Sequence, residues 1–271
     1  MDKKFDELDS FLKTSYENNK LHKKKKKKIV VVIINIITIS TLIAAGIGIK
    51  SINDYKKDLK NSEIYEKEII SKKPTEIEKE IENKEDIYDF NNLLSINDET
   101  VGWLKVKNTK IDIPIVQTNN NTYYLNHNFK KEYSSFGWVY ADYRNDFNNL
   151  SKNTIMYGHT YKEDLMFSSL KNTLTDKWLD NEENYIIEFT TPKENYKFKV
   201  FSIWTTKNTD SYLKVDFSPQ EFNEYINNSL SKSIRNFNTK IDESDKILTL
   251  STCYLNSKNR LVVQAKLEKT A

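Results

Sequence analysis

The sequence of 271 residues contains a single cysteine, Cys253, so no disulfide can form within the chain. A small secreted scaffold held together by disulfides is therefore excluded. A lone cysteine is either a buried small hydrophobic residue or a reactive thiol. The residues around Cys253 have to decide between these two interpretations.

Glycine, proline and histidine are also scarce, with five, four and three residues. Only Gly102, Gly137 and Gly158 lie outside the long apolar run described below, and the chain has no glycine-rich phosphate loop and no G-x-S-x-G turn. No group of Cys and His residues has the spacing of zinc ligands. We therefore expect neither a metal nor a cofactor.

Charge of one sign is not in excess either, because 42 Lys and Arg against 39 Asp and Glu leave a net charge of +3. Nucleic-acid binding usually needs a basic face on the folded part, so we expect no nucleic-acid partner. Aromatic residues are plentiful at 12%, which a disordered chain would not show. The composition indicates a packed core.

Residues 29–49 form an apolar run without a charged residue. At 1.5 Å per residue it can span a hydrocarbon core of about 30 Å. A buried core helix or a cleaved signal peptide is the alternative, but the run is longer than a signal's apolar region and no A-x-A-like site follows. The six lysines of residues 23–28 place that flank in the cytoplasm by the positive-inside rule. This predicts a single-pass protein of the cell membrane.

The predicted organisation has four parts. Residues 1–28 form a cytoplasmic tail and residues 29–49 the membrane anchor. Residues 50–84 are rich in Lys and Glu and form an extracellular stalk, either partly helical or a disordered linker. Residues 85–271 form an extracellular globular domain.

Beyond residue 100, short runs of β-branched and aromatic residues alternate with Asn, Asp, Gly and Pro. Strands are expected at 102–106, 111–116, 137–141, 154–157, 185–189, 196–205, 247–251 and 261–267. Helices are expected at 85–96, 164–170 and 219–234, the last with Ser218 as its N-cap. Eight strands with few helices predict a mainly β fold, a closed or nearly closed barrel.

Cys253 follows the strand expected at 247–251, and Arg260 opens the next strand. A thiol at the end of a strand is held by a rigid scaffold and is partly exposed, as a reactive thiol should be. A guanidinium stabilises developing negative charge well, although an arginine near a turn is often only solvated. Nothing marks the carboxylates Asp142 and Asp146 as more than surface charges.

A thiol that attacks an amide needs a base or acid beside it, and histidine is the usual choice. His22 lies on the predicted cytoplasmic side and is excluded. His127 lies in an aromatic stretch, where we expect it to pack or to form a hydrogen bond. His159 follows a strand, as Cys253 does, so we favour His159.

Several motifs resemble those of a known family. TLSTC at 249–253 with the following Arg260-Leu-Val-Val resembles the signature of sortases, and YGHT at 157–160 resembles the segment that carries their histidine. Segments similar to class B sortases are found at 101–117, 123–129 and 136–172. The resemblance extends over residues 83–267.

The resemblance implies a sortase-type eight-stranded β-barrel with an N-terminal helix and a long helix before the cysteine strand. It implies an extracellular cysteine transpeptidase of Gram-positive bacteria. Such an enzyme cleaves a C-terminal sorting motif such as N-P-x-T-N, N-P-x-T-G or S-P-x-T-G after Thr. It joins the surface protein to a peptidoglycan amine through a thioacyl intermediate.

Residue roles follow from the same resemblance. Cys253 would be the nucleophile, His159 the general acid and base, and Arg260 the group that stabilises the substrate carbonyl or the oxyanion. Residues that would line the peptide groove are Leu125, Tyr212, Leu213 and Ser251. The short connection after Cys253, and Tyr254 where an acidic residue often stands, leave the preferred motif open.

Two other kinds of protein share some of these features. L,D-transpeptidases carry their histidine close before the cysteine, and papain-like peptidases carry it after, whereas here His159 precedes Cys253 by 94 positions (253 − 159). A membrane-tethered β-barrel that binds wall polymer, with Cys253 as inert packing, is the non-enzymatic alternative.

Overall fold

The computed structural model describes residues 2–77, 87–161, 164–207, 212–254 and 259–268, and the side chains of 2–7, 253 and 254 lie outside this description. The chain divides into two compact units, Met1–Lys57 and Asp58–Ala271. Helix α1 (Asp2–Ile70) begins in the first unit and ends in the second. Each unit is described by itself.

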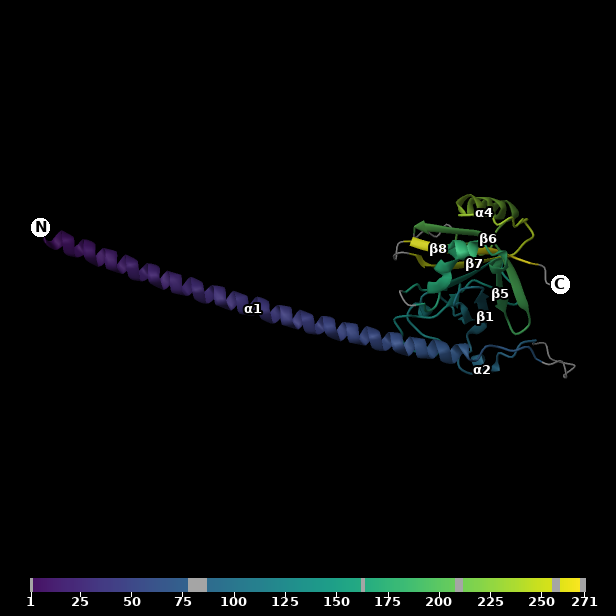
Figure 1. Ribbon diagram of the computed structural model, residues 1–271, viewed down its shortest axis with the longest axis horizontal. Helices are drawn as coiled ribbons and strands as arrows, with labels where there is room; N and C mark the ends of the chain where they lie inside the picture. The colour runs from purple at the N-terminus through teal and green to yellow at the C-terminus, as the bar shows by residue number, and fades with distance from the viewer. Residues whose placement is uncertain (1, 78–86, 162–163, 208–211, 255–258, 269–271) are drawn as a thin grey trace. The chain divides into compact units, whose positions relative to one another are not determined.

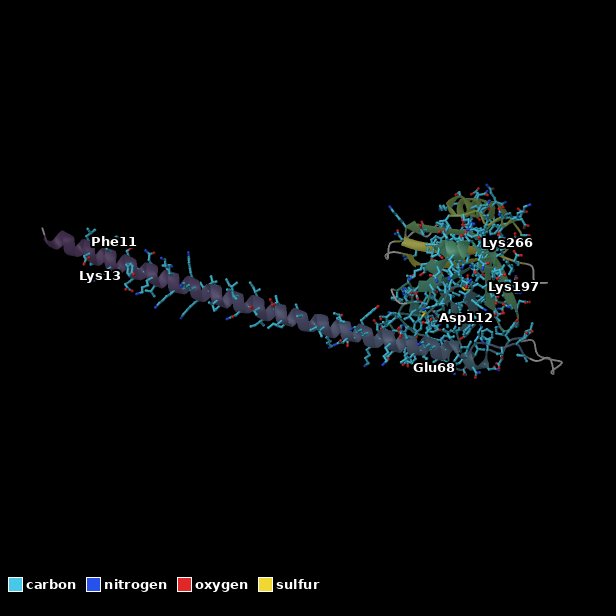
Figure 2. All side chains as sticks on the ribbon, viewed as in Figure 1. Phe11, Lys13, Glu68, Asp112, Lys197 and Lys266 are labelled. Atoms are coloured by element: carbon cyan, nitrogen blue, oxygen red, sulfur yellow. The ribbon has the colours of Figure 1, made fainter. Side chains whose placement is uncertain are left out.

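The first unit is helical throughout its described length. Residues 8–57 are all exposed, and side chains such as Phe11 and Lys13 stand out from the helix (Figure 2). The apolar stretch at 29–49 makes α1 long and apolar enough to cross a membrane. A helix that exposes apolar side chains on all sides is suited to lipid surroundings.

The second unit begins with the last turns of α1, earlier than the boundary expected at residue 85. Ile69 is fully buried, and the hydroxyl groups of Ser62 and Ser134 lie 3.3 Å apart. Glu68 forms an ion pair with Lys130 at 3.0 Å. Part of the segment predicted as a stalk is therefore helix packed on the globular domain.

Eight strands close into a barrel in the order β1-β2-β3-β4-β7-β8-β6-β5 (Figure 1). Their bounds are β1 Thr100–Val106, β2 Asp112–Val116, β3 Tyr140–Ala141, β4 Asn153–Gly158, β5 Ile186–Thr190, β6 Asn195–Lys207, β7 Ile247–Tyr254 and β8 Asn259–Leu267. Neighbours pair antiparallel except β2 with β3 and β4 with β7. The predicted barrel is confirmed, and all eight predicted strands overlap observed ones.

On one side of the barrel, buried apolar side chains cover both the inner and the outer face of the sheet. The main core cluster includes Leu104, Met156 and Val263, as expected for a barrel of this size. A second cluster, with Trp204, Phe222 and others, lies between helix α4 (Pro219–Lys232) and the outer face of β6, β7 and β8. Strand β8 is therefore buried over five consecutive residues.

Helix α4 lies over β6 on the outside of the barrel (Figure 1). Ser218 caps it as predicted: its hydroxyl accepts from the backbone N–H of Glu221, whose carboxylate accepts from the backbone N–H of Ser218. This reciprocal pair satisfies two free donors of the first turn. Pro219 at the first helical position needs no donor.

Two predicted helices are wrong over much of their length. Of the described residues 87–96, only those of α2 (Asn91–Leu94) are α-helical, and the backbone N–H groups of Ile87 and Tyr88 both donate to the carbonyl of Pro192 instead. In 164–170, Met166 has φ 53°, a left-handed conformation that no α-helix contains. The remaining short elements are η1 Tyr123–Leu125, η2 Ser168–Leu174, α3 Asp176–Leu179 and η3 Glu182–Tyr185.

Candidate active site

Strand β7 brings the three predicted catalytic positions together. It runs parallel to β4, with Gly158 opposite Thr252, and antiparallel to β8, with Cys253 opposite Arg260. Neighbouring strands are about 4.8 Å apart, so His159 and Arg260 flank the backbone of Cys253 from its two sides. The side chain of Cys253 lies outside the described residues.

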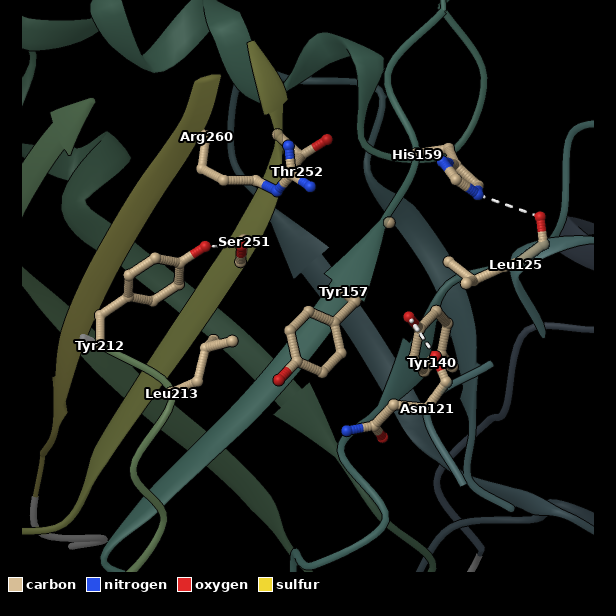
Figure 3. A pocket seen from close by; sticks show the side chains of 11 residues that line it. Asn121, Leu125, Tyr140, Tyr157, His159, Tyr212, Leu213, Ser251, Thr252 and Arg260 are labelled. Atoms are coloured by element: carbon tan, nitrogen blue, oxygen red, sulfur yellow. Dashed lines mark hydrogen bonds between the residues drawn. The ribbon is translucent and has the colours of Figure 1, made fainter. Parts of the chain in front are cut away.

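One pocket of about 290 Å³ opens at this end of the barrel (Figure 3). Its lining includes His159 and Arg260 and all four residues predicted for the peptide groove. The described residues that line it are Asn121, Leu125, Tyr140, Tyr157, Gly158, His159, Tyr212, Leu213, Ser251, Thr252 and Arg260. Residues predicted separately, from distant segments of the sequence, thus share one cavity.

The imidazole of His159 is held from its Nε2 atom. Nε2 lies 3.0 Å from the carbonyl oxygen of Leu125, which can only accept, so Nε2 carries a hydrogen. The other nitrogen, Nδ1, is then the one that takes up or releases a proton. Burial, and next the charge of Arg260, lower the pKa of His159, while the bond to Leu125 opposes this change.

The loop that carries His159 is tied to the strand before Cys253. The hydroxyl groups of Thr160 and Thr252 are hydrogen-bonded, and the N–H of Phe167 donates to the carbonyl of His159 at 3.1 Å. The first bond joins the segment after β4 to the end of β7, and the second closes that segment on itself. The spacing between positions 159 and 253 is therefore fixed by the ladder and by side chains.

Gly158 is required by close packing. A Cβ atom there would lie 2.5 Å from Cγ of Phe167, which is fully buried. No side chain fits at that distance without moving the aromatic ring. The glycine before the histidine therefore lets the loop fold back over the end of β4.

His127, the alternative histidine, lies elsewhere. Its ring stacks on Tyr123 with centroids 4.0 Å apart, and its Nδ1 lies 2.8 Å from the carbonyl oxygen of Tyr123. It is not among the described residues that line the pocket. Packing and hydrogen bonding, as expected from its aromatic surroundings, account for His127.

Hydrogen bonds hold two of the residues predicted for the groove, Tyr212 and Ser251. The hydroxyl groups of Tyr212 and Ser251 lie 2.9 Å apart, and Tyr225 donates to the carbonyl of Tyr212 at 2.9 Å. Leu125 is 39% exposed and offers an apolar surface beside His159. Arg260 donates to the carbonyl of Asn259 at 3.1 Å.

A family model described as Sortase domain matches residues 104–268, more than half of the chain. The chain belongs to the sortase family. It is 35% identical to Sortase B of Staphylococcus aureus (strain NCTC 8325 / PS 47) over 186 residues. This aligned region covers 67% of this chain and 75% of that protein. Sortases are cysteine transpeptidases, so the chain is an enzyme of this kind.

Solved structures of sortase B share the fold. Sortase B from B. anthracis in complex with AAEK1 matches with a TM-score of 0.70 at 34% identity, over 79% of this chain and 99% of that one. The S. aureus sortase B–substrate complex has a TM-score of 0.62 at 34% identity, over 67% and 85%. Sortase B complexed with triglycine has a TM-score of 0.63 at 34% identity, over 67% and 86%. The predicted resemblance to class B sortases is confirmed.

In this sortase, the expectation that Asp142 is only a surface charge is wrong. Asp142 is 0% exposed and binds Arg144 through both carboxylate oxygens, at 2.8 and 2.7 Å. Burial opposes its ionisation, but hydrogen bonds from Arg144 and Tyr157 outweigh this and keep the pKa of Asp142 below its usual range. The one signal in the sequence was an arginine two residues after the aspartate.

Proposed function

We propose that this sortase is anchored in the cell membrane by residues 29–49, with its N-terminus in the cytoplasm and residues 85–271 acting outside the cell. The lysine run at 23–28 supports this orientation. Its substrates are surface proteins that carry a C-terminal sorting motif of the N-P-x-T-N, N-P-x-T-G or S-P-x-T-G type. The enzyme cleaves the motif after Thr and attaches the protein to peptidoglycan.

In the first step, the Cys253 thiolate attacks the carbonyl carbon of the motif's Thr. The C–N bond that follows Thr breaks, and a thioacyl bond to sulfur forms. His159, as imidazolium, gives its Nδ1 proton to the departing amine. Because burial lowers the pKa of His159, the imidazolium is a minor form at neutral pH.

In the second step, an amine of a peptidoglycan precursor attacks the thioacyl carbon. The C–S bond breaks, His159 takes the proton from the incoming amine, and the thiolate returns. The solved complex of sortase B with triglycine supports an amine as the acceptor. In both steps Arg260 stabilises the carbonyl oxygen as it gains negative charge.

The peptide lies along Leu125, Tyr212, Leu213 and Ser251, which line the same pocket as His159 and Arg260. The solved complex of sortase B with a substrate supports peptide binding at such a site. The observation that carries the proposal is this common lining, together with the pairing of Cys253 opposite Arg260 in the ladder.

The test uses the full-length chain in detergent and quenched peptides with the three motifs and an L-P-x-T-G peptide. Wild type and Cys253→Ala are compared with and without triglycine, and products are identified by mass spectrometry. We expect cleavage after Thr, a thioacyl adduct and a triglycine product with wild type only. No cleavage of any peptide by folded wild type, or cleavage by Cys253→Ala, would refute the proposal.

A further inference from the structure

The buried carboxylate of Asp142 is the centre of a polar cluster beside the pocket. Oδ1 accepts from the backbone N–H of Arg144 at 3.0 Å and from its Nε at 2.8 Å. Oδ2 accepts from Arg144 Nη2 at 2.7 Å, from the Tyr157 hydroxyl at 2.7 Å and from Asn121 Nδ2 at 3.0 Å. Five donors on one carboxylate leave it no freedom to turn.

The cluster reaches three segments that line the pocket. Tyr157 is on β4, Asn121 is in the connection between β2 and η1, and Leu213 is in the connection between β6 and α4. Leu213 is reached through Arg144, whose Nη2 also donates to the Leu213 carbonyl at 3.0 Å. Asp142 itself is fully buried and does not line the pocket.

Asn121 is held at every polar group of its side chain. Its side-chain oxygen accepts from the backbone N–H of Tyr143 at 3.0 Å, and the side-chain amide donates to Asp142. Its backbone carbonyl also accepts from the Tyr140 hydroxyl at 3.0 Å. A side chain fixed in this way presents the same surface to each incoming ligand, so little side-chain entropy is lost on binding.

These three lining residues lie away from the catalytic end. In Figure 3, Asn121, Tyr157 and Leu213 occupy the lower half of the pocket, whereas His159, Thr252 and Arg260 lie in the upper half. A substitution that displaces these three residues should therefore weaken peptide binding more than it disturbs His159 and Arg260.

We propose that Asp142 is a positioning residue for substrate binding, which acts by fixing Tyr157, Asn121 and, through Arg144, the backbone of Leu213 as one wall of the pocket. The inference rests on the proposed function, because it takes this pocket as the peptide groove. An ion pair between a buried carboxylate and a partly exposed guanidinium is by itself weak evidence for stability, so a role in shaping the wall is a better account of the cluster.

The test compares steady-state cleavage of the best sorting peptide by the full-length chain in detergent. Asp142→Asn removes the negative charge and one of the two acceptor oxygens. Arg144→Lys removes the two-point hydrogen bonding to Asp142 and the hydrogen bond to the Leu213 carbonyl. The matched control is Arg235→Lys, since Arg235 also joins a carboxylate, Asp180 at 3.0 Å, to a carbonyl, Leu179 at 2.6 Å, but outside the pocket. Thermal melts verify that each variant is folded at the assay temperature.

We expect KM to rise roughly 5–30-fold in Asp142→Asn and roughly 3–10-fold in Arg144→Lys, with kcat within about twofold of wild type. Arg235→Lys should keep both constants within about twofold. If Asp142→Asn does not fold, the KM of Arg144→Lys tests the inference alone.

Unchanged KM in folded variants, with kcat lower only in proportion to the folded fraction, would overturn the inference and leave the proposed function standing. No cleavage by wild type of any peptide would instead refute the proposed function, and the inference with it.

Discussion

Glu66, on the last turns of α1, is a carboxylate in surroundings that disfavour its charge. It is 7% exposed, and its Oε2 has no hydrogen-bond partner among the described residues. Burial raises its pKa to about 7, although the backbone N–H of Met166 and the charge of Lys110 oppose this change. The free energy of unfolding should therefore depend on whether Glu66 is protonated.

The sign follows from linkage, because the folded-state pKa lies above the unfolded value of 4.5. Below pH 4.5 both states hold the proton, and above pH 7 the folded state has to bury a charge. Glu66→Gln should therefore raise the free energy of unfolding by roughly 2–3 kcal/mol more at pH 8 than at pH 4. Urea unfolding of residues 58–271 at the two pH values measures this. The exposed Glu224→Gln on α4 is the control, and an equal effect of Glu66→Gln at both pH values would contradict the prediction.

Arg260 influences the protonation of His159 through its charge. After burial, this charge is the second cause that lowers the pKa of His159. In a Cys253→Ala background, Arg260→Gln should therefore raise the pKa of His159. An NMR titration of the imidazole Cε1–H signals measures it, with His127 as an internal reference and Arg235→Gln as the control. A pKa that stays constant or falls would show that the charge of Arg260 does not act on His159.

At the residue scale, short motifs at strand ends predicted positions that line one pocket, whereas burial that depends on distant segments was not predicted. His159 and Arg260 were predicted because each stands at a strand end beside a short motif. Asp142 was missed because its burial depends on Tyr157 and Asn121, which are distant in the sequence. Composition around Asp142 resembles that of any polar turn.

At the scale of elements, strands were predicted better than helices. Alternating β-branched and aromatic runs mark each strand directly. The helix predicted at 164–170 is wrong because Met166 is in a left-handed conformation, directly before Phe167, whose ring packs against Gly158. That constraint lies in the packing between β4 and its following loop, and periodicity does not report it.

The close approach of Phe167 to Gly158 predicts the effect of an added methyl group. Gly158→Ala should displace the ring or the His159 loop, lower the free energy of unfolding by about 1–3 kcal/mol and reduce peptide cleavage at least tenfold, since small shifts of catalytic groups have large effects. Urea unfolding and cleavage rates measure both. Gly46→Ala is the matched control, because nothing lies within 4 Å of its Cβ position. Normal cleavage by Gly158→Ala would contradict this account.

At the scale of the whole molecule, the globular unit includes the end of a helix that continues from the apolar stretch. Sequence composition predicted residues 58–70 as part of a stalk, since the whole segment 50–84 is rich in Lys and Glu. Their few inward residues, among them Ile69 and Ser62, are recognisable only once their partners are known. The expected boundary at residue 85 therefore omits part of the core.

A fragment of residues 58–271 should be more stable than one of residues 85–271. The longer fragment keeps the buried Ile69 and the ion pair of Glu68 with Lys130. Burial of one isoleucine alone contributes about 2 kcal/mol. We expect the free energy of unfolding of the shorter fragment to be lower by at least that amount, and its urea midpoint to be lower as a result. Coincident unfolding curves would show that the helix end does not stabilise the barrel.

Strand β7 is paired along its length on both sides, by β4 and by β8, and the ladder with β4 ends one residue before Cys253. Amide groups in such a strand exchange with solvent only when the most stable cooperative unit of a protein opens. We therefore expect Cys253, the proposed nucleophile, to stand at the edge of the part of the molecule that opens last. On this basis we expect denaturant to remove activity together with the barrel rather than before it, so that loss of activity and loss of the barrel follow the same curve.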